Sequence, residues 1–197
     1  MTDLLESVTP ILAPLRNRAR WLVGLSGGLD STVLLHLLNR FVRQQQSPPS
    51  LLAIHVHHGL SANAQSWQEY CEALCQQLDV ALVCQRIVLP GNPRGGLESV
   101  AREARYAAFD SLRRGDEVLF LGHHRDDQLE TLMLNLFRSR GIAGLAGMAV
   151  CSHPEALRVR PLLQHQRSEL LDYATSALAA IPGVRFIGTA AHRASVV

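Results

Sequence analysis

Residues 26–31 are Ser-Gly-Gly-Leu-Asp-Ser, and they stand between two apolar runs at 21–25 and 33–38. An apolar strand, a glycine turn and the start of a helix together form an anion site. The glycines let the backbone approach a ligand closely, and the first helical N–H groups point toward it with the helix dipole behind them. The segment therefore predicts a loop that binds phosphate.

Polar side chains of this loop favour a nucleotide as the ligand. Asp30 can face a magnesium ion, and the hydroxyls of Ser26, Ser31 and Thr32 add hydrogen-bond donors. The turn lacks the Gly-Lys-Ser/Thr of a Walker loop, and it is not Gly-x-Gly-x-x-Gly. A different kind of nucleotide loop is therefore expected.

A second polar segment, His55-Val-His57-His58-Gly59-Leu60, ends another apolar run. Three histidines near a strand end can ligate a metal, but no acidic or cysteine partner stands at a useful spacing. His57 or His58 can instead contact the nucleotide, with Gly59 allowing a close approach, or the histidines can simply close a turn. We retain His57 as a candidate nucleotide-binding residue.

A third polar segment follows the apolar run at 118–121 and contains Asp126, Asp127 and Glu130. One aspartate is suited to capping the helix that starts there, which leaves the other and Glu130 unexplained. One face of this helix holds Asp127, Glu130, Thr131 and Arg138, and the opposite face holds Leu129, Leu132, Met133, Leu136 and Phe137. A carboxylate pair one turn apart can hold magnesium or a cationic amine, although a solvated charged face has the same pattern.

Arginines on the helical pattern before this segment are candidate phosphate ligands. Arg102 and Arg105, with Arg138 further on, can bind phosphates bidentately. The same side chains can form surface ion pairs, such as Glu98 with Arg102, that contribute little to stability.

The elements that position these segments alternate along the chain. The predicted strands are Trp21–Leu25, Leu51–Val56, Ala81–Val88, Val118–Leu121 and Leu157–Arg160. The predicted helices are Ser31–Val42, Asn63–Leu78, Leu97–Arg114, Asp126–Arg138 and Arg167–Leu178. This alternation predicts an α/β fold, a Rossmann-like parallel sheet with helices on both faces. Ligands of such sheets bind beyond the carboxyl ends of the strands, where all three polar segments fall.

Composition places the chain among ordinary globular proteins. Its 197 residues are 47% apolar and 18% charged, and a net charge of +2 permits a nucleic-acid partner without indicating one. The four cysteines include no Cys-x-x-Cys pair, and their apolar surroundings predict buried thiols. Neither a leader nor an apolar run long enough to span a bilayer is found, so we expect a cytoplasmic protein with no membrane partner.

The loop at 26–31 resembles the PP-loop of the ATP-pyrophosphatase superfamily, which has the adenine nucleotide alpha hydrolase-like fold. Over roughly residues 20–173 the chain resembles, more narrowly, the N-terminal domain of the tRNA(Ile)-lysidine synthetase family. Five motifs in order carry this resemblance: Ser26–Ser31, His55–Leu60, Glu98-x-x-Ala-Arg-x-x-Arg-Tyr, His123-His-Arg-Asp-Asp-Gln-x-Glu-Thr and Gly141-x-x-Gly-Leu-x-Gly-Met148.

The resemblance implies a ligase reaction with ATP and Mg²⁺. ATP would adenylate the 2-oxygen of the wobble cytidine of a tRNA(Ile) with a CAU anticodon, and the ε-amine of free L-lysine would then displace AMP to give lysidine. The implied nucleotide-binding residues are Ser26, Gly27, Gly28, Leu29, Asp30, Ser31 and His57, with Asp30 on the metal.

The resemblance also assigns the other candidate catalytic residues. Asp127 and Glu130 match the positions associated with the lysine ammonium group. Arg102 or Arg105 can stabilise the charge that develops on the phosphate during transfer.

Two departures from the family pattern bear on this expectation. Arg138-Ser139-Arg140-Gly141 stands where the family has Arg-Gly-Ser-Gly, and after Tyr173 the family's Asp-Pro-Ser/Thr-Asn stretch and Arg-Asn segment are missing. We expect residues 1–175 to form the catalytic domain and residues 176–197 to form a poorly ordered tail, as in a C-terminally truncated member.

Other functions stay open at this point. A tRNA thiolase of the same superfamily shares the His-His-Arg-Asp-Asp segment, although missing Cys-x-x-Cys pairs argue against an iron–sulfur cluster. A truncated ATP-binding remnant would bind ATP without forming product. An amidotransferase-linked synthetase would need a partner that supplies ammonia. The sequence does not decide whether the chain forms a homodimer.

Overall fold

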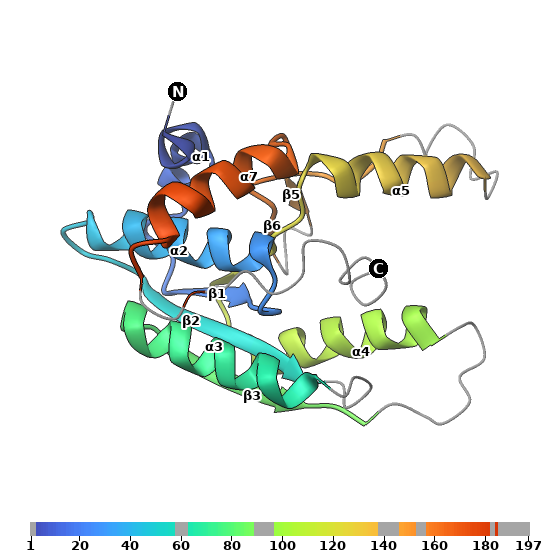
Figure 1. The fold of residues 1–197 in the computed structure, drawn as a ribbon, viewed down its shortest axis with the longest axis horizontal. Helices are drawn as coiled ribbons and strands as arrows, with labels where there is room; N and C mark the ends of the chain where they lie inside the picture. Colours follow the sequence, from blue (N-terminus) through green and yellow to red (C-terminus); the bar gives the residue numbers. More distant parts are fainter. Residues whose placement is uncertain are drawn as a thin grey trace.

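The computed structural model describes residues 3–57, 63–88, 97–137, 146–152, 157–181 and 184, with the backbone alone at 97 and 98. Six strands in this part of the chain form one sheet of order β3-β2-β1-β4-β6-β5 (Figure 1). They are β1 (Arg20–Gly24), β2 (Ser50–His57), β3 (Ala81–Arg86), β4 (Glu117–Phe120), β5 (Cys151–Ser152) and β6 (Arg158–Val159). All neighbours are parallel except β5 and β6. The predicted α/β fold is confirmed.

Helices cover both faces of this sheet. They are α1 (Leu4–Leu12), α2 (Leu29–Arg43), α3 (Ala64–Leu78), α4 (Leu97–Leu112), α5 (Arg125–Phe137) and α7 (Arg167–Tyr173), with 3₁₀ and π turns at Ala13–Leu15 and Ala174–Leu178. Side chains of β1 alternate between two cores, as the pleat of a strand requires. Trp21 and Val23 pack with α1, α2, α3 and α7, whereas Leu22 packs with Phe109 of α4.

The order of the strands follows the doubly wound pattern, in which the chain changes direction along the sheet once. The chain passes from β1 to β2 and β3 through α2 and α3, and it then returns to β4 on the other side of β1. The strand order therefore reverses between the neighbouring strands β1 and β4. In doubly wound sheets ligands bind at such a reversal point.

Two elements were not predicted from the sequence. The N-terminal helix α1 starts at a cap in which Asp3 accepts a hydrogen bond from the Leu5 N–H at 3.1 Å, and it buries Leu4, Leu5, Val8 and Leu12. The edge strand β5 is two residues long and antiparallel. A two-residue strand is too short for a periodic pattern to reveal it.

The prediction of buried thiols is correct for two of the four cysteines. Cys71 and Cys75 are buried in α3, where burial raises the pKa of Cys75 to about 12 and that of Cys71 further. Cys84 is half-buried, and Cys151 is exposed. Cys151 lies on the edge strand β5, where one side has no neighbouring strand to cover it.

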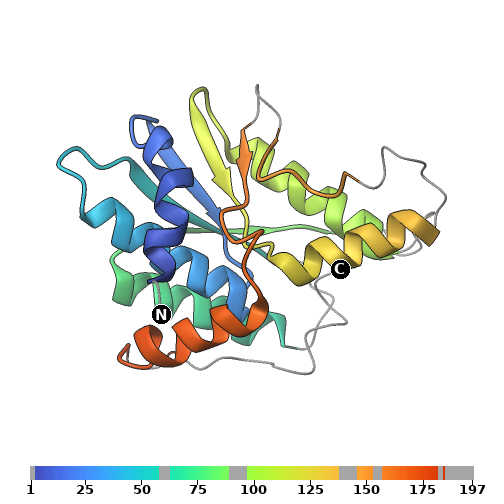
Figure 2. The same ribbon diagram turned by 90° about the horizontal axis from the view of Figure 1, so that it is seen from above.

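Helix α5 extends away from the rest of the molecule (Figures 1 and 2). None of its residues is buried, and Leu129, Met133, Leu136 and Phe137 are 52%, 53%, 53% and 83% exposed. The leucine-rich face predicted from the sequence is therefore largely exposed, and only its Leu132 is half-buried. No helix of the described chain combines the length and apolarity needed to cross a membrane.

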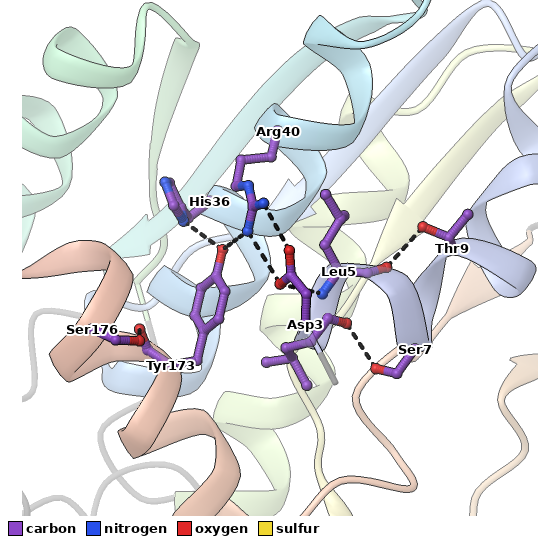
Figure 3. Close-up of polar contacts among 9 residues, drawn as sticks. Asp3, Leu5, Ser7, Thr9, His36, Arg40, Tyr173 and Ser176 are labelled. Carbon is purple, nitrogen blue, oxygen red and sulfur yellow. Dashed lines mark hydrogen bonds and ion pairs between the residues drawn. The ribbon is translucent and has the colours of Figure 1, made fainter. Parts of the chain in front are cut away.

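A polar network joins α1, α2 and α7 (Figure 3). Arg40 donates to both carboxylate oxygens of Asp3, at 3.3 and 2.9 Å, and to the Tyr173 hydroxyl at 3.1 Å. Because that hydroxyl oxygen accepts from Arg40, its proton is free to go to Nδ1 of His36, which lies 2.8 Å away. The network thereby fixes α7 on α2 through one tyrosine.

Replacing Tyr173 by Phe should destabilise the fold by about 1–2 kcal/mol, because His36 and Arg40 each lose a partner in a half-buried site. Urea denaturation measures the change. Tyr106→Phe is the matched control, since the Tyr106 hydroxyl makes no hydrogen bond to a described residue. Equal free energies of unfolding for the two variants would contradict the role given to Tyr173.

Stability should also fall in mild acid. Burial, assisted by the charge of Arg40, lowers the pKa of His36 from 6.5 to about 4. Between these values the unfolded chain binds a proton that the folded chain does not, so stability is full above pH 6.5 and decreases toward pH 4. From pH 7 to 5 this group contributes a loss of up to about 2 kcal/mol. In urea titrations at both values, His36→Gln should lose less stability than the wild type, and an equal loss would contradict the assignment.

Candidate functional site

Hydrogen bonds within residues 26–31 hold the loop after β1 in a compact turn. The Ser26 N–H donates to Oγ of Ser31 at 3.1 Å, and the Ser31 hydroxyl donates to the Gly28 carbonyl at 3.1 Å. The two serine hydroxyls lie 3.0 Å apart, so the Ser26 proton goes to Ser31. Gly28 caps α2, and Leu29 is the first helical residue.

Gly27 has a positive φ of 87°, which a residue with a side chain rarely adopts. A Cβ placed there would lie 3.4 Å from Sγ of Cys71 and 3.5 Å from the ring of Tyr70. Thr32 is fully buried, and its hydroxyl lies 3.5 Å from that of Tyr70. Thr32, predicted as a donor to phosphate, is thus turned toward α3.

A buried histidine, His55, contacts the backbone just before the loop at 26–31. Nδ1 of His55, at the carboxyl end of β2, donates to the Leu25 carbonyl at 2.8 Å and lies 3.4 Å from Sγ of Cys71. Burial lowers the pKa of His55, which keeps the ring neutral. Sequence reasoning singled out His57, whereas His55 makes the loop contact.

The segment after β4 packs directly against the same loop. A Cβ at Gly122 would lie 3.1 Å from the carbonyl carbon of Asp30 and 3.2 Å from the backbone N of Ser31. A side chain at position 122 would force the two backbones apart by a few tenths of an ångström. The sequence signal was a glycine immediately after a strand, and it was not assigned a role.

Two residues further on, His124 stands between two carboxylates. Its Nε2 lies 3.6 Å from Oδ2 of Asp30 and 3.6 Å from Oδ2 of Asp127. Burial by itself would lower the pKa of His124, but the nearby carboxylates of Asp30, Asp127 and Asp126 outweigh it and raise the pKa. Because Nδ1 accepts a hydrogen bond, the ring carries its proton on Nε2, which faces both carboxylates.

His124 also caps the start of α5, where the sequence predicts an aspartate as the cap. Its Nδ1 accepts from the Asp126 N–H at 3.2 Å, and Asp127 accepts from the His124 N–H at 2.8 Å. This reciprocal pair satisfies two N–H groups at the helix start, as a capping box does. Burial, opposed by this hydrogen bond, raises the pKa of Asp127.

The other candidate carboxylate and the candidate histidine are less enclosed. Glu130 lies one turn after Asp127 on α5 and is exposed, with no hydrogen bond or ion pair to a described residue. His57 is half-buried at the end of β2. The structure thus joins Asp30 and Asp127 through His124 and leaves Glu130 open to solvent.

Arginines surround the neighbouring His123. Its Nδ1 is buried without a hydrogen-bond partner, and burial together with the charges of Arg160, Arg102 and Arg105 lowers its pKa to about 3. Nε of Arg105 is also buried and unpartnered. Arg102 is exposed and lies 5.5 Å from the centre of the Tyr106 ring. This cluster has donors available for an anion.

Asp30 meets the requirements of a magnesium ligand on this chain's own geometry. Its Oδ1 is buried and accepts no hydrogen bond from a described residue. Magnesium proteins commonly supply one or two carboxylates and leave the remaining positions to phosphates and water. No group of three or more metal-binding side chains occurs in the part of the chain that the structure describes.

Several predicted site features lie outside the described residues. They are His58, Gly59 and Leu60, the side chain of Glu98, residues 138–145, and most of the predicted tail, of which 182, 183 and 185–197 are not described. Of the glycine motif at 141–148, Gly147 and Met148 are described. The Gln128 side-chain amide pairs with the Met148 backbone through two hydrogen bonds of 2.9 and 2.7 Å, which ties the motif to α5.

Comparison with solved structures agrees with this fold. A U34-tRNA thiolase from Methanococcus maripaludis superposes with a TM-score of 0.69 at 22% identity, covering 88% of this chain and 62% of the thiolase. An NH₃-dependent NAD synthetase from Campylobacter jejuni superposes with a TM-score of 0.53 at 16% identity, covering 89% of this chain and 73% of the synthetase. At such identities the likeness concerns the fold alone.

Curated relatives named tRNA(Ile)-lysidine synthase are more similar in sequence. Those from Pseudomonas fluorescens, Pseudomonas putida and Histophilus somni are 46%, 48% and 44% identical over 173, 164 and 173 residues. The matches cover 87%, 83% and 87% of this chain but 38%, 38% and 40% of the relatives. The chain thus spans about two fifths of their length.

A family model described as a PP-loop domain matches residues 2–180. This range contains the loop at 26–31, the carboxyl ends of β2 and β4, and α7. This match confirms the superfamily predicted from the motif at 26–31. The chain therefore belongs to the PP-loop family of ATP-binding domains.

Proposed function

We propose that this chain carries the ATP-dependent chemistry of lysidine formation on tRNA(Ile). ATP would adenylate the C2 oxygen of the wobble cytidine, with release of pyrophosphate. The ε-amine of lysine would then attack C2 and expel AMP, losing a proton as the carbon–nitrogen bond forms. The observation that carries the proposal is the meeting of Asp30 and Asp127 at His124, because it joins the nucleotide loop to the carboxylate pair.

The first step would use the loop and the arginine cluster. Backbone N–H groups of residues 26–31 and the start of α2 would bind the phosphates. Asp30 would hold a magnesium ion, and that ion would neutralise charge on the phosphate chain. Arg105, with its unpartnered Nε, and Arg102 would stabilise the charge that develops at the α-phosphate.

The second step would use the first two turns of α5. Asp127 and Glu130 lie one turn apart, which suits two oxygens around one ammonium group. The raised pKa of Asp127 suits it to receiving a proton from the amine. The Nε2 of His124, which faces the same carboxylate at 3.6 Å, would limit that tendency.

The proposal is tested with unmodified tRNA(Ile) transcript, ATP, magnesium and labelled lysine. We expect label on the tRNA together with release of AMP in equal amounts. Pyrophosphate release without label on the tRNA would mean that adenylation occurs but lysine transfer does not. ATP binding with neither product would leave a nucleotide-binding domain without this activity, and thiolated tRNA formed when a sulfur donor replaces lysine would favour the thiolase alternative.

Replacing Glu130 by Gln should raise the KM for lysine about 10- to 100-fold, because one charged partner of the ammonium group is lost. The rate of ATP–pyrophosphate exchange in the presence of tRNA should stay unchanged. Glu6→Gln, an exposed glutamate on α1, is the matched control. A KM unaffected by Glu130→Gln, or a parallel loss of exchange, would contradict the assignment of Glu130 to lysine.

A further inference from the structure

Arg167, the first residue of α7, approaches the nucleotide loop from a distant part of the chain. Its Nε lies 3.9 Å from Oδ1 of Asp30, the oxygen that accepts no hydrogen bond from a described residue. Helix α7 packs on α2, which starts in that loop (Figure 1). The guanidinium is thus brought to the loop by tertiary packing.

The donors of Arg167 are not used elsewhere in the described structure. The contact with Asp30 is too long to be a hydrogen bond, and Arg167 donates no hydrogen bond to a described residue. By contrast, Arg40 is engaged by Asp3 and Tyr173, and Arg160 by the Ala149 carbonyl and Ser152. With 28% of its side chain exposed, Arg167 can receive a ligand.

The backbone that carries Arg167 is held at several points. The Gln166 N–H donates to Glu169 at 2.6 Å in a capping box, and Leu170 is fully buried. The His165 carbonyl accepts from the Arg125 N–H at 2.8 Å, which ties the turn before α7 to the start of α5. Tyr173 fixes the other end of the helix. The guanidinium is therefore presented from a fixed position.

The loop beside Arg167, rather than the mixed charges around Asp30, favours an anionic ligand for this guanidinium. Asp30 faces Arg167 and His124, and Asp127 faces His124. The loop beside them has the N–H groups and the positive helix end that bind phosphate. A guanidinium with free planar donors matches phosphate oxygens better than it matches a carboxylate at 3.9 Å.

We propose that Arg167 is a phosphate-binding residue of the nucleotide site and contacts the phosphate chain of ATP. The inference rests on the proposed function, in that ATP occupies the loop at 26–31. Arg167 would thus add a phosphate-binding residue from α7 to those contributed by the loop after β1, by α4 and by α5.

The test is calorimetric titration of the full chain with adenosine and with the ATP analogue that carries a methylene group between the α and β phosphates. Arg167→Gln should weaken binding of the analogue about 10- to 100-fold and leave adenosine unchanged. Arg167→Lys, which keeps the charge but not the planar fork, should give an intermediate loss. The control is Arg18→Gln, which should match the wild type. Arg18 lies before β1, and its partly exposed side chain pairs with Asp116.

The outcomes separate this inference from the proposed function. Wild type that binds neither ligand would overturn nucleotide binding altogether. If the wild type and Arg167→Gln bind the analogue equally well, the inference alone is overturned. Equal weakening of adenosine and analogue would also overturn it, because a disturbed fold, and not a lost phosphate contact, would then be the cause.

Discussion

The close approach of the Gly122 backbone to the first turn of α2 is the constraint on which the rest of the site depends. A Cβ at position 122 would lie 3.1–3.2 Å from backbone atoms of Asp30 and Ser31, closer than side chains normally pack. This contact fixes the distance between the loops that follow β1 and β4. Because His124 comes two residues later, its ring is carried into contact with Asp30, and α5 starts at a set place beside the loop.

One imidazole then joins two acidic groups that the chain order keeps far apart. Asp30 and Asp127 would repel each other in a partly buried site, and the Nε2–H of His124 faces both carboxylates at 3.6 Å. The same ring caps a helix through its other nitrogen. Capping, electrostatics and the positions of both carboxylates thus depend on one side chain.

Periodicity and glycine placement were sufficient to predict the sheet, the loop at 26–31 and the convergence of the segments after β1 and β4. They could not reveal which histidine makes which contact, since His55, His57, His123 and His124 look alike in sequence. Tertiary packing decides that His55 supports the loop and that His124, in the turn after β4, caps α5. The roles of Gly122 and Arg167 depend on contacts between distant segments, and no local pattern records such contacts. The boundary at residue 175 and the roles of the site residues remain predictions.

The exposure of α5 has a consequence for local stability. A helix of 13 residues without a buried side chain depends on its cap and on the Gln128–Met148 pairing, both in its first turns. Short helices without tertiary packing are marginal in water, and local opening requires little free energy where few apolar contacts are lost. The amides of its second half should therefore exchange with solvent in a cooperative unit separate from the sheet. Asp127 belongs to the ordered first turn and Glu130 borders the opening unit, so an amine bound by both carboxylates would slow that exchange.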